Sequence, residues 1–459
     1  MINLNDTICA ISTPMGEGGI SVIRISGIDT FKITEEVFFK SKDKSKSFNI
    51  SETESHTIHF GFFFDGKIII DEVLVSIFKS PNSFTGDDVI EISTHGGVYV
   101  TRKVLEVLLK HGCRHAEPGE FTRRAFLNGR IDLLQAEAIA DLIKAKTEEA
   151  HKSSINQLEG SLSEFIKHIR DELLSVTALV ELELDFAEED IEFAHKEDIK
   201  NRSLKIIEDL NEIVNSYIRG KVIRDGINVV IAGKPNSGKS SLFNSLLKTE
   251  RAIVSDISGT TRDYLEENLI IDGVLFNLTD TAGLRATADI IENEGIQRSY
   301  NKISKADMVV YLVDLSDNKN GIKNSLEFFN QQIKSSNKLL VYTKKDLAEN
   351  NIPKPGISIS INDRDSISHM KKEMVRKVRE NESELNSGKI VITNIRHKIC
   401  LENTVASLKN VISSIDKNMS GEFLSIDLRN ALNHLGEITG SVTNDDILTY
   451  VFSKFCIGK

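Results

Sequence analysis

A phosphate-binding loop is the first feature whose residue types and spacing indicate chemistry. Residues Gly233–Ser240 fit the pattern GxxxxGK[ST], between a short apolar run, Asn228–Ala232, and a helical pattern over Ser241–Leu247. Glycines let backbone N–H groups turn toward phosphate oxygens, and the dipole of the following helix favours their negative charge. Lys239 would reach the β- and γ-phosphates, and Ser240 would bind Mg²⁺. This order of strand, loop and helix disfavours the alternative, a glycine-rich structural turn.

Three further short motifs follow in the order that a GTP-hydrolysing domain requires. Gly259–Thr261 precedes the apolar run Leu275–Thr279 and offers a hydroxyl to Mg²⁺. Asp280–Gly283 follows that run, where a carboxylate can hold the Mg²⁺ shell and a glycine N–H can meet the γ-phosphate. In Thr343–Asp346 the carboxylate of Asp346 can accept the paired hydrogen bonds of guanine, which adenine does not offer. Four motifs, each at a strand end, predict a GTPase.

Some positions depart from the usual GTPase pattern. Thr343 stands where the base-reading motif begins with Asn, and Ser358–Ser360 matches the last base-side element poorly. Leu284 occupies the position of the glutamine that orients the attacking water in Ras-like enzymes, and a leucine cannot hydrogen-bond. Glu292 and Glu294 are candidates for that water, although both could simply cover a solvated helix. An arginine from elsewhere or a monovalent cation could supply the missing positive charge.

The elements that must position these motifs alternate between strand and helix. Short apolar runs at 228–232, 275–279, 308–313, 338–342 and 357–361 are separated by segments of helical pattern or length, which is typical of a doubly wound parallel sheet. We therefore expect an α/β domain over 222–380.

The rest of the chain has two other patterns. Residues 1–118 are predicted to be mixed α and β, with a helix over 99–110 and strands at 8–12, 20–25, 58–64, 67–70, 73–78 and 89–92. Residues 119–221 and 381–459 carry apolar residues at intervals of three and four, as in a helical bundle. The economical architecture is one helical domain interrupted by the α/β domain, and four separate domains are the alternative.

Composition limits the class of protein. The chain has 459 residues and a net charge of −11, so a wholly basic nucleic-acid-binding surface is excluded and any RNA contact must use a local patch. No stretch reaches the roughly 18 apolar residues of a membrane span, and residues 1–13 do not look like a secretion signal. The four cysteines are scattered without a CxxC pair, which favours a reducing compartment. We expect a cytoplasmic protein without a membrane segment.

Segments spread along the whole chain resemble the family of tRNA-modification GTPases known as MnmE or TrmE. The GTPase motifs are generic, whereas the run Ala-Phe-Leu-Asn-Gly at 125–129 and Cys-Ile-Gly-Lys at 456–459 are far more specific. The other matching segments are Asp6–Ile8, Arg24–Gly27, Asn82–Gly86, His95–Gly97, Pro118–Phe121 and Gln135–Ile143.

The resemblance implies an N-terminal folate-binding and dimerisation domain at 1–118, a helical domain at 119–221 and 381–459, and an inserted Ras-like GTPase domain at 222–380. Family members are homodimers that work with the flavoprotein MnmG (GidA). Together they add a carboxymethylaminomethyl or aminomethyl group at carbon 5 of the wobble uridine of certain tRNAs. The one-carbon unit comes from a tetrahydrofolate, such as the 5-formyl or 5,10-methylene form.

The resemblance also implies roles for single residues. A folate pocket maps to Arg24, Glu91, Arg130 and Lys459. Mg²⁺ maps to Ser240 and Thr261, and K⁺ to Asn236, Ser255, Ile257 and Thr260. Catalytic roles fall on Glu292, Lys239 and Cys456. With the motifs, the positions expected to contact GTP are Asn236, Ser237, Gly238, Lys239, Ser240, Ser241, Ser255, Asp256, Ile257, Ser258, Gly259, Thr260, Thr261, Asp280, Thr281, Ala282, Gly283, Thr343, Lys344, Lys345, Asp346, Ser358, Ile359 and Ser360.

Several alternatives stay open from the sequence. Cys456 is a structural thiol or a catalytic one, and it fits a prenylation signal poorly. His95, beside two glycines, is interpreted as part of a turn rather than as a metal ligand. The whole chain could instead be a GTPase switch without a role in base modification, or an interaction protein whose nucleotide is structural.

Overall fold

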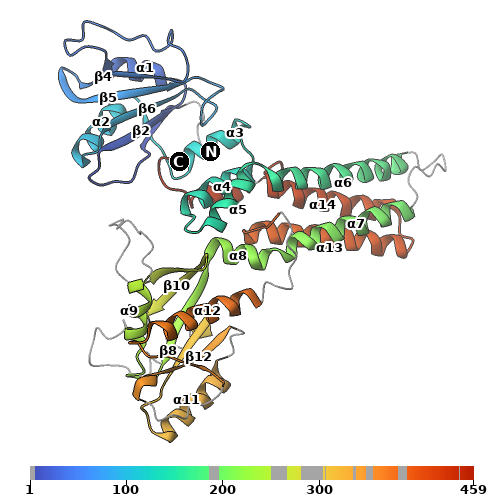
Figure 1. Ribbon diagram of the computed structural model, residues 1–459. Coiled ribbons are helices and arrows are strands. Elements are labelled where there is room, and N and C mark those ends of the chain that lie inside the picture. Colours follow the sequence, from blue (N-terminus) through green and yellow to red (C-terminus); the bar gives the residue numbers. More distant parts are fainter. Residues whose placement is uncertain are drawn as a thin grey trace, which may run out of the picture. The chain divides into compact units, whose positions relative to one another are not determined.

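The computed structural model describes residues 6–185, 196–249, 266–280, 303–304, 306–333, 337–347, 355–380, 390–443 and 445–459 (Figure 1). The chain forms two compact units. The first comprises residues 1–143, 155–196 and 410–459, and the second comprises residues 144–154 and 197–409. In the sequence the second unit therefore interrupts the first, and each unit is described by itself below.

The first unit begins with a seven-stranded mixed sheet of order β3-β4-β5-β6-β2-β1-β7. Its elements are β1 (Ile8–Ile11), β2 (Ile20–Ser26), α1 (Thr30–Val37), β3 (Phe38–Phe39), β4 (Thr57–Asp65), β5 (Ile68–Phe78), β6 (Val89–His95), α2 (Val98–Lys110) and β7 (Arg114–His115). Helices α1 and α2 cover one face, where Ile33, Val104 and Leu108 pack on the apolar residues of the central strands.

The predicted strands of this sheet are present, with one difference. The runs 67–70 and 73–78 form a single strand, β5, although Asp71 and Glu72 interrupt the apolar pattern. Pairing with β4 continues through these two residues, so the ladder extends across the polar interruption. A two-residue turn, Gly66-Lys67, joins β4 to β5 between the paired residues Asp65 and Ile68, and Gly66 has the positive φ of +58° that suits its first position.

The helical part of the first unit is built from segments far apart in sequence. Its helices are α3 (Glu120–Leu127), α4 (Leu133–Lys144), α5 (Glu148–Leu158, partly in the second unit), α6 (Ser161–Asp185), α14 (Gly421–Thr439) and α15 (Asp445–Phe452). Apolar residues of α4 and α15 pack together, and a hydrogen bond of 2.7 Å joins Arg429 of α14 to Glu181 of α6.

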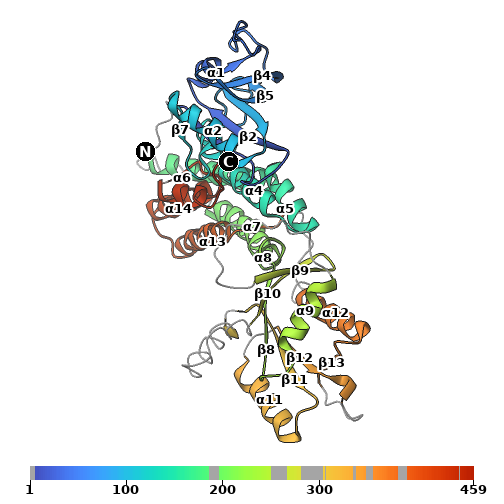
Figure 2. The same ribbon diagram turned by 90° about the vertical axis from the view of Figure 1, so that its left-hand side faces the viewer.

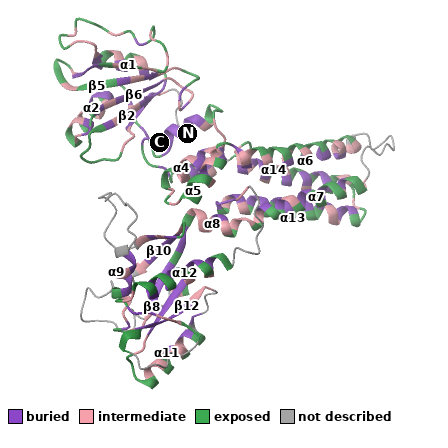
Figure 3. Ribbon diagram, viewed as in Figure 1, coloured by how far each residue is buried: buried purple, intermediate pink, exposed green. Residues whose placement is uncertain are grey.

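The second unit contains a six-stranded sheet of order β13-β12-β11-β8-β10-β9, parallel except for the β9–β10 pair. Its elements are α7 (Lys196–Asn215), α8 (Tyr217–Asp225), β8 (Ile227–Gly233), α9 (Lys239–Thr249), β9 (Glu266–Ile271), β10 (Val274–Asp280), β11 (Met308–Asp314), α11 (Lys319–Gln332), β12 (Lys338–Thr343), β13 (Ile357–Ser358), α12 (Arg364–Glu380) and α13 (Ile395–Asp416). Apolar side chains of β8 and β11 fill cores on both faces, and β8 and β12 are drawn as buried in Figure 3.

The fold class predicted from the sequence is confirmed: a mixed sheet, helices and a doubly wound parallel sheet are all present. Among the described helices, none is both long and apolar enough to cross a membrane.

Candidate functional site

The ends of the parallel strands place the GTPase motifs along one edge of the second sheet. The last residue of β8, Gly233, lies opposite Leu312 of β11, and Asp314 lies opposite Thr343 of β12. On the other side of β8, Asp280 at the end of β10 lies opposite Ile231. The phosphate-binding loop leaves β8 where the chain connections diverge to both sides, which is the usual ligand position in such sheets.

Backbone geometry in the loop explains its residue types. Asn236 and Gly238 both have a positive φ, +62° and +91°. At Gly233 a Cβ atom would lie 2.6 Å from the carbonyl oxygen of Leu312, so the loop can leave the strand only as glycine. The Lys239 ammonium donates to the carbonyl oxygens of Gly233 (2.9 Å) and Lys234 (2.8 Å). The cation is therefore held over the loop that it would serve.

Thr343, which departs from the usual motif, joins the two halves of the nucleotide site. Its hydroxyl donates to the carbonyl oxygen of Ser237 at 2.9 Å, and both residues are buried. This hydrogen bond ties the end of β12 to the phosphate-binding loop. A hydroxyl at this position thus makes a contact to the loop even without the amide of an asparagine.

The base-side residues also converge. A hydrogen bond with the Ser360 hydroxyl holds the pKa of the exposed Asp346 carboxyl below its usual value, so this acceptor is ionised at neutral pH. The backbone N–H of Lys345 donates to the carbonyl of Ile359 at 3.1 Å. The poorly matching segment Ser358–Ser360 therefore lies directly beside the residues that would bind guanine.

A partly buried ion pair holds the lysine of the base-side motif. The Lys344 ammonium lies 2.5 Å from a carboxylate oxygen of Asp314, which also accepts a hydrogen bond from Ser316. Burial alone would raise the pKa of Asp314, but the hydrogen bonds from Lys344 and Ser316 outweigh it and lower that pKa.

Other predicted nucleotide and metal residues fall outside the described chain. These are Ser255–Thr261, Thr281–Gly283, Leu284, Glu292 and Glu294. Of the remainder, Ser240 and Ser241 are exposed in the first turn of α9, and Asn236 is exposed in the loop. Within the described residues no cluster of three His, Cys, Asp or Glu side chains could hold a metal ion.

In the first unit, Arg24 of β2 and Glu91 of β6 lie opposite each other in register. The guanidinium donates to one carboxylate oxygen of Glu91 through Nε (3.0 Å) and Nη2 (2.8 Å), and only 11% of the Arg24 side chain is exposed. The ring of Phe84 lies 4.6 Å from the guanidinium carbon. The third nitrogen, Nη1, is buried without a hydrogen-bond partner in the described structure. Such a donor is suited to a ligand oxygen.

Residues 456–459 return to this position. Ser12 donates to the carbonyl oxygen of Gly458 at 3.1 Å, and a Cβ on Gly458 would lie 2.3 Å from the carbonyl oxygen of Ile11. In both views the end of the chain lies beside β2 (Figures 1 and 2). Burial and the nearby charge of Arg24 lower the pKa of the Lys459 ammonium, although Glu91 acts in the opposite direction. Arg24, Glu91 and Lys459 are thus brought together.

Three other predicted residues lie nearer the solvent. Arg130 is exposed in the turn after α3, where its backbone N–H donates to Ala125. Cys456 is an exposed free thiol, and its carbonyl accepts from the N–H of Gly119 at 3.4 Å. His95 ends β6, and its ring contacts Asp71 at 2.6 Å, a hydrogen bond that raises the pKa of the imidazole.

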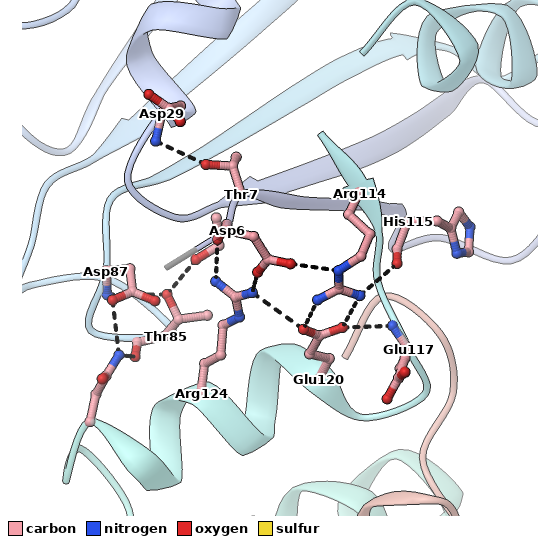
Figure 4. A network of polar contacts seen from close by, with 12 residues as sticks. Asp6, Thr7, Asp29, Thr85, Asp87, Arg114, His115, Glu117, Glu120 and Arg124 are labelled. Atoms are coloured by element: carbon pink, nitrogen blue, oxygen red, sulfur yellow. Dashed lines mark hydrogen bonds and ion pairs between the residues drawn. The ribbon is translucent and has the colours of Figure 1, made fainter. Parts of the chain in front are cut away.

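Sequence reasoning missed a polar network that attaches α3 to the first sheet (Figure 4). The buried Arg124 guanidinium donates to the backbone and side chain of Asp6 (2.9 and 2.5 Å) and to Glu120. Arg114 of β7 donates to the same two carboxylates. Burial alone would raise the pKa values of Asp6 and Glu120, but these hydrogen bonds lower both. The sequence indicates this network only through two short segments that resemble the family and contain Asp6 and Glu120, namely Asp6–Ile8 and Pro118–Phe121.

Comparisons with known proteins cover the whole chain. Residues 7–130 match a family described as the GTP-binding protein TrmE N-terminus, and residues 133–456 match the MnmE helical domain. A protein of Chlorobium phaeobacteroides named tRNA modification GTPase MnmE is 44% identical over 99% of this chain and 97% of its own length. One of the same name from Christiangramia forsetii is 40% identical over the full length of both chains.

Similar solved structures cover a smaller part. The G domain of the T. maritima FeoB iron transporter is 26% identical to the matching part of this chain, with a TM-score of 0.25. The match covers 33% of this chain and 98% of that one.

We predict that Thr343→Val weakens GTP binding about fivefold, because it leaves the buried carbonyl of Ser237 without its donor, at a cost of about 1 kcal/mol. Thr343→Asn keeps a donor and should retain the affinity. Both variants should still prefer GTP to ATP because Asp346 is intact, and titration calorimetry with each nucleotide measures this. Equal GTP affinity in Thr343→Val and the unmodified protein would show that the hydrogen bond is dispensable.

We also predict that Arg124→Leu destabilises the first unit by about 3 kcal/mol at pH 7, because the partly buried Asp6 and the buried Glu120 each lose one of the two guanidinium groups that donate to them. The lowered folded-state pKa values of Asp6 and Glu120 mean that their contribution is complete above the unfolded-state values near about 4 and is lost as pH falls through the folded-state values. The difference between variant and unmodified protein should therefore shrink on acidification below about pH 4. Hydrogen exchange of β1 and β7 at several pH values measures it, with the exposed Arg102→Leu as control; a constant difference would contradict the electrostatic account.

Proposed function

The chain belongs to the MnmE family of tRNA modification GTPases, and we propose that it acts in the cytoplasm with the flavoprotein MnmG (GidA) on the wobble uridine of certain tRNAs. The product carries a carboxymethylaminomethyl or aminomethyl group at carbon 5. Relatives named tRNA modification GTPase MnmE match the chain over nearly its full length, which supports the assignment of both units to one reaction. GTP hydrolysis in the second unit drives the conformational changes that the modification needs.

The observation that carries the proposal is the buried Nη1 of Arg24, which lies beside Glu91 and Lys459 and has no hydrogen-bond partner among the described residues. A tetrahydrofolate derivative, in its 5-formyl or 5,10-methylene form, fits this donor set. Its carboxylates or ring carbonyl would accept from Arg24 and Lys459, and Glu91 would accept from the amino groups of the pterin. The bound cofactor supplies the one-carbon unit. Arg130 and Cys456 are further candidates, Arg130 for binding and Cys456 as a catalytic thiol.

In the nucleotide site, we assign Lys239 to the phosphates, Asp346 to guanine, and Ser240 with Thr261 to Mg²⁺. Asn236, within the phosphate-binding loop, is one K⁺ ligand, and Ser255, Ile257 and Thr260 complete the set. Its exposed side chain, on a residue of positive φ at the rim of the loop, is available to a cation. K⁺ would supply the positive charge that an arginine provides in other GTPases. Glu292 would orient the attacking water, the role of the glutamine that Leu284 replaces in this chain.

We further propose that the protein is a homodimer through its first sheet. Strand pairing places Ile58, Phe60 and Leu74 on the face opposite the α1–α2 core, together with Ile20 further along the sheet. Phe60 is 53% exposed and Ile58 is 67% exposed, although large apolar side chains on a sheet face are usually covered. A second copy of the sheet would cover them.

We predict that hydrolysis is faster in K⁺ than in Na⁺ at equal ionic strength, because Na⁺ is smaller than the proposed site. Asn236→Ala should remove the K⁺ stimulation. Glu292→Ala should slow hydrolysis with GTP affinity nearly unchanged, and phosphate release with parallel calorimetry measures both. Equal rates in the two cations would refute the K⁺ assignment.

We predict that deleting residues 456–459 abolishes tRNA modification and weakens 5-formyltetrahydrofolate binding, but leaves GTP binding intact, because the nucleotide site lies within the second unit. Arg24→Ala should weaken folate binding at least tenfold, as expected for a lost charge-assisted hydrogen bond of about 1.5–3 kcal/mol. The exposed Lys454→Ala serves as a control, and mass spectrometry of wobble uridines reports modification. Unchanged folate affinity in both variants would place the pocket elsewhere, and a protein that turns over GTP but never binds folate would favour the pure GTPase switch.

A further inference from the structure

The loop between β5 and β6, residues 80–88, carries the aromatic ring that covers Arg24. The loop is bonded to itself, because Ser80 donates to the carbonyl of Gly86 (2.8 Å) and the N–H of Gly86 donates to the Ser83 hydroxyl (3.0 Å). One contact to the sheet is the hydroxyl pair of Thr85 and Ser26, 2.7 Å apart. Phe84 is only partly buried, packed against a small apolar cluster that includes Phe121. The position of this ring therefore depends on what holds the loop.

Asn128, the residue that follows α3, holds the loop from the other side. Its side-chain amide donates to the carbonyl oxygen of Thr85 at 2.8 Å and to a carboxylate oxygen of Asp87 at 3.0 Å. Between these two partners, Gly86 has a φ of +85°, and a Cβ there would lie 3.1 Å from the Cβ of Asn128. The loop and the side chain are in direct contact, so a change at Asn128 is transmitted to the loop.

The helix that presents Asn128 is itself fixed. Glu120, Arg124 and Asn128 are spaced four apart, so they follow one another along one side of α3. Glu120 accepts a hydrogen bond from Arg114, and Arg124 donates one to Asp6; both bonds are partly buried. Thr85 and Asp87 lie beside this network in Figure 4. The row of three side chains therefore anchors the helix at its start and middle and the loop at its end.

We propose that Asn128 is a positioning residue for the Arg24 site: it holds the 80–88 loop so that Phe84 stays over the guanidinium while Nη1 stays free for a ligand oxygen. Asn128 does not touch the ligand in this proposal. The ligand's identity rests on the proposed function above, whereas the hold on the loop does not.

The amide of Asn128 suits this task better than its near relatives. An aspartate offers no donor and would place a second negative charge beside Asp87. Burial raises the pKa of Asp87, which shows that a charge at this position is already unfavourable. An alanine removes both hydrogen bonds but not the helix, because the backbone N–H of Asn128 still donates to Arg124. A loss of function in Asn128→Ala can therefore be separated from unfolding of α3.

The chain has no tryptophan, so Phe84→Trp gives a single fluorescent reporter on the loop. Adding Asn128→Ala should shift the emission of this tryptophan to longer wavelength and increase its quenching by acrylamide, in the absence of any ligand. Without the reporter, Asn128→Ala should weaken 5-formyltetrahydrofolate binding about tenfold, and GTP turnover should be unchanged. Leu127→Ala, an exposed neighbour, is the matched control and should alter neither measurement.

An exchange of partners provides a rescue. Asn128→Asp alone should weaken folate binding more than Asn128→Ala does, and adding Asp87→Asn should recover part of the loss because a donor again faces a carboxylate. Unchanged emission and quenching in Asn128→Ala would overturn the hold on the loop. A changed emission with full folate affinity, in a protein where Arg24→Ala loses affinity, would overturn the positioning role. If the unmodified protein binds no folate, the proposed ligand is wrong, and the reporter still decides whether Asn128 holds the loop.

Discussion

The first unit depends on the guanidinium of Arg24, which is largely buried among groups from distant parts of the chain. Arg24 donates two hydrogen bonds to Glu91 across a strand pair, and two aromatic rings, those of Phe84 and Phe121, lie against it. An arginine stays protonated even when it is buried, so each of its nitrogens needs a hydrogen-bond acceptor, either from the protein or from a ligand. The 80–88 loop, helix α3 and residues 456–459 all lie near the guanidinium. Within the described part of the chain its Nη1 has no hydrogen-bond partner.

In the second unit the nucleotide site depends in a similar way on the backbone at the end of strand β8, where the phosphate-binding loop begins. Glycine at position 233 lets the chain leave the sheet against β11, and Thr343 then ties the loop to β12. The base side is fixed separately, by Lys344 on Asp314 and by Ser360 on Asp346. The Thr343 hydroxyl thus joins the phosphate-binding half to the base-binding half, and each half also has contacts of its own.

Patterns in short stretches of sequence predict the features that are determined by neighbouring residues, which here are the strands and the phosphate-binding loop. Alternation of apolar residues located the strands, and glycines with a lysine and a serine located the phosphate-binding loop, because both are set by neighbours in the sequence. The polar pair Asp71-Glu72 predicts a break between two strands, whereas pairing with β4 continues across it. The network around Arg124 could not be predicted from pattern alone. Its partner Asp6 lies 118 residues away in sequence, and a buried arginine has no periodic signal of its own.

Ser12 and Gly458 meet although 446 residues separate them in the sequence. The ribosome therefore synthesises the entire second unit after strands β1 and β2 and before residues 456–459, which contact them. Domains generally fold as they emerge, so the GTPase sheet has its complete set of strands while the first sheet still lacks residues 456–459. During that interval Arg24 and Glu91 have no lysine beside them. Completion of the Arg24 site therefore requires residues that are synthesised only after the whole second unit.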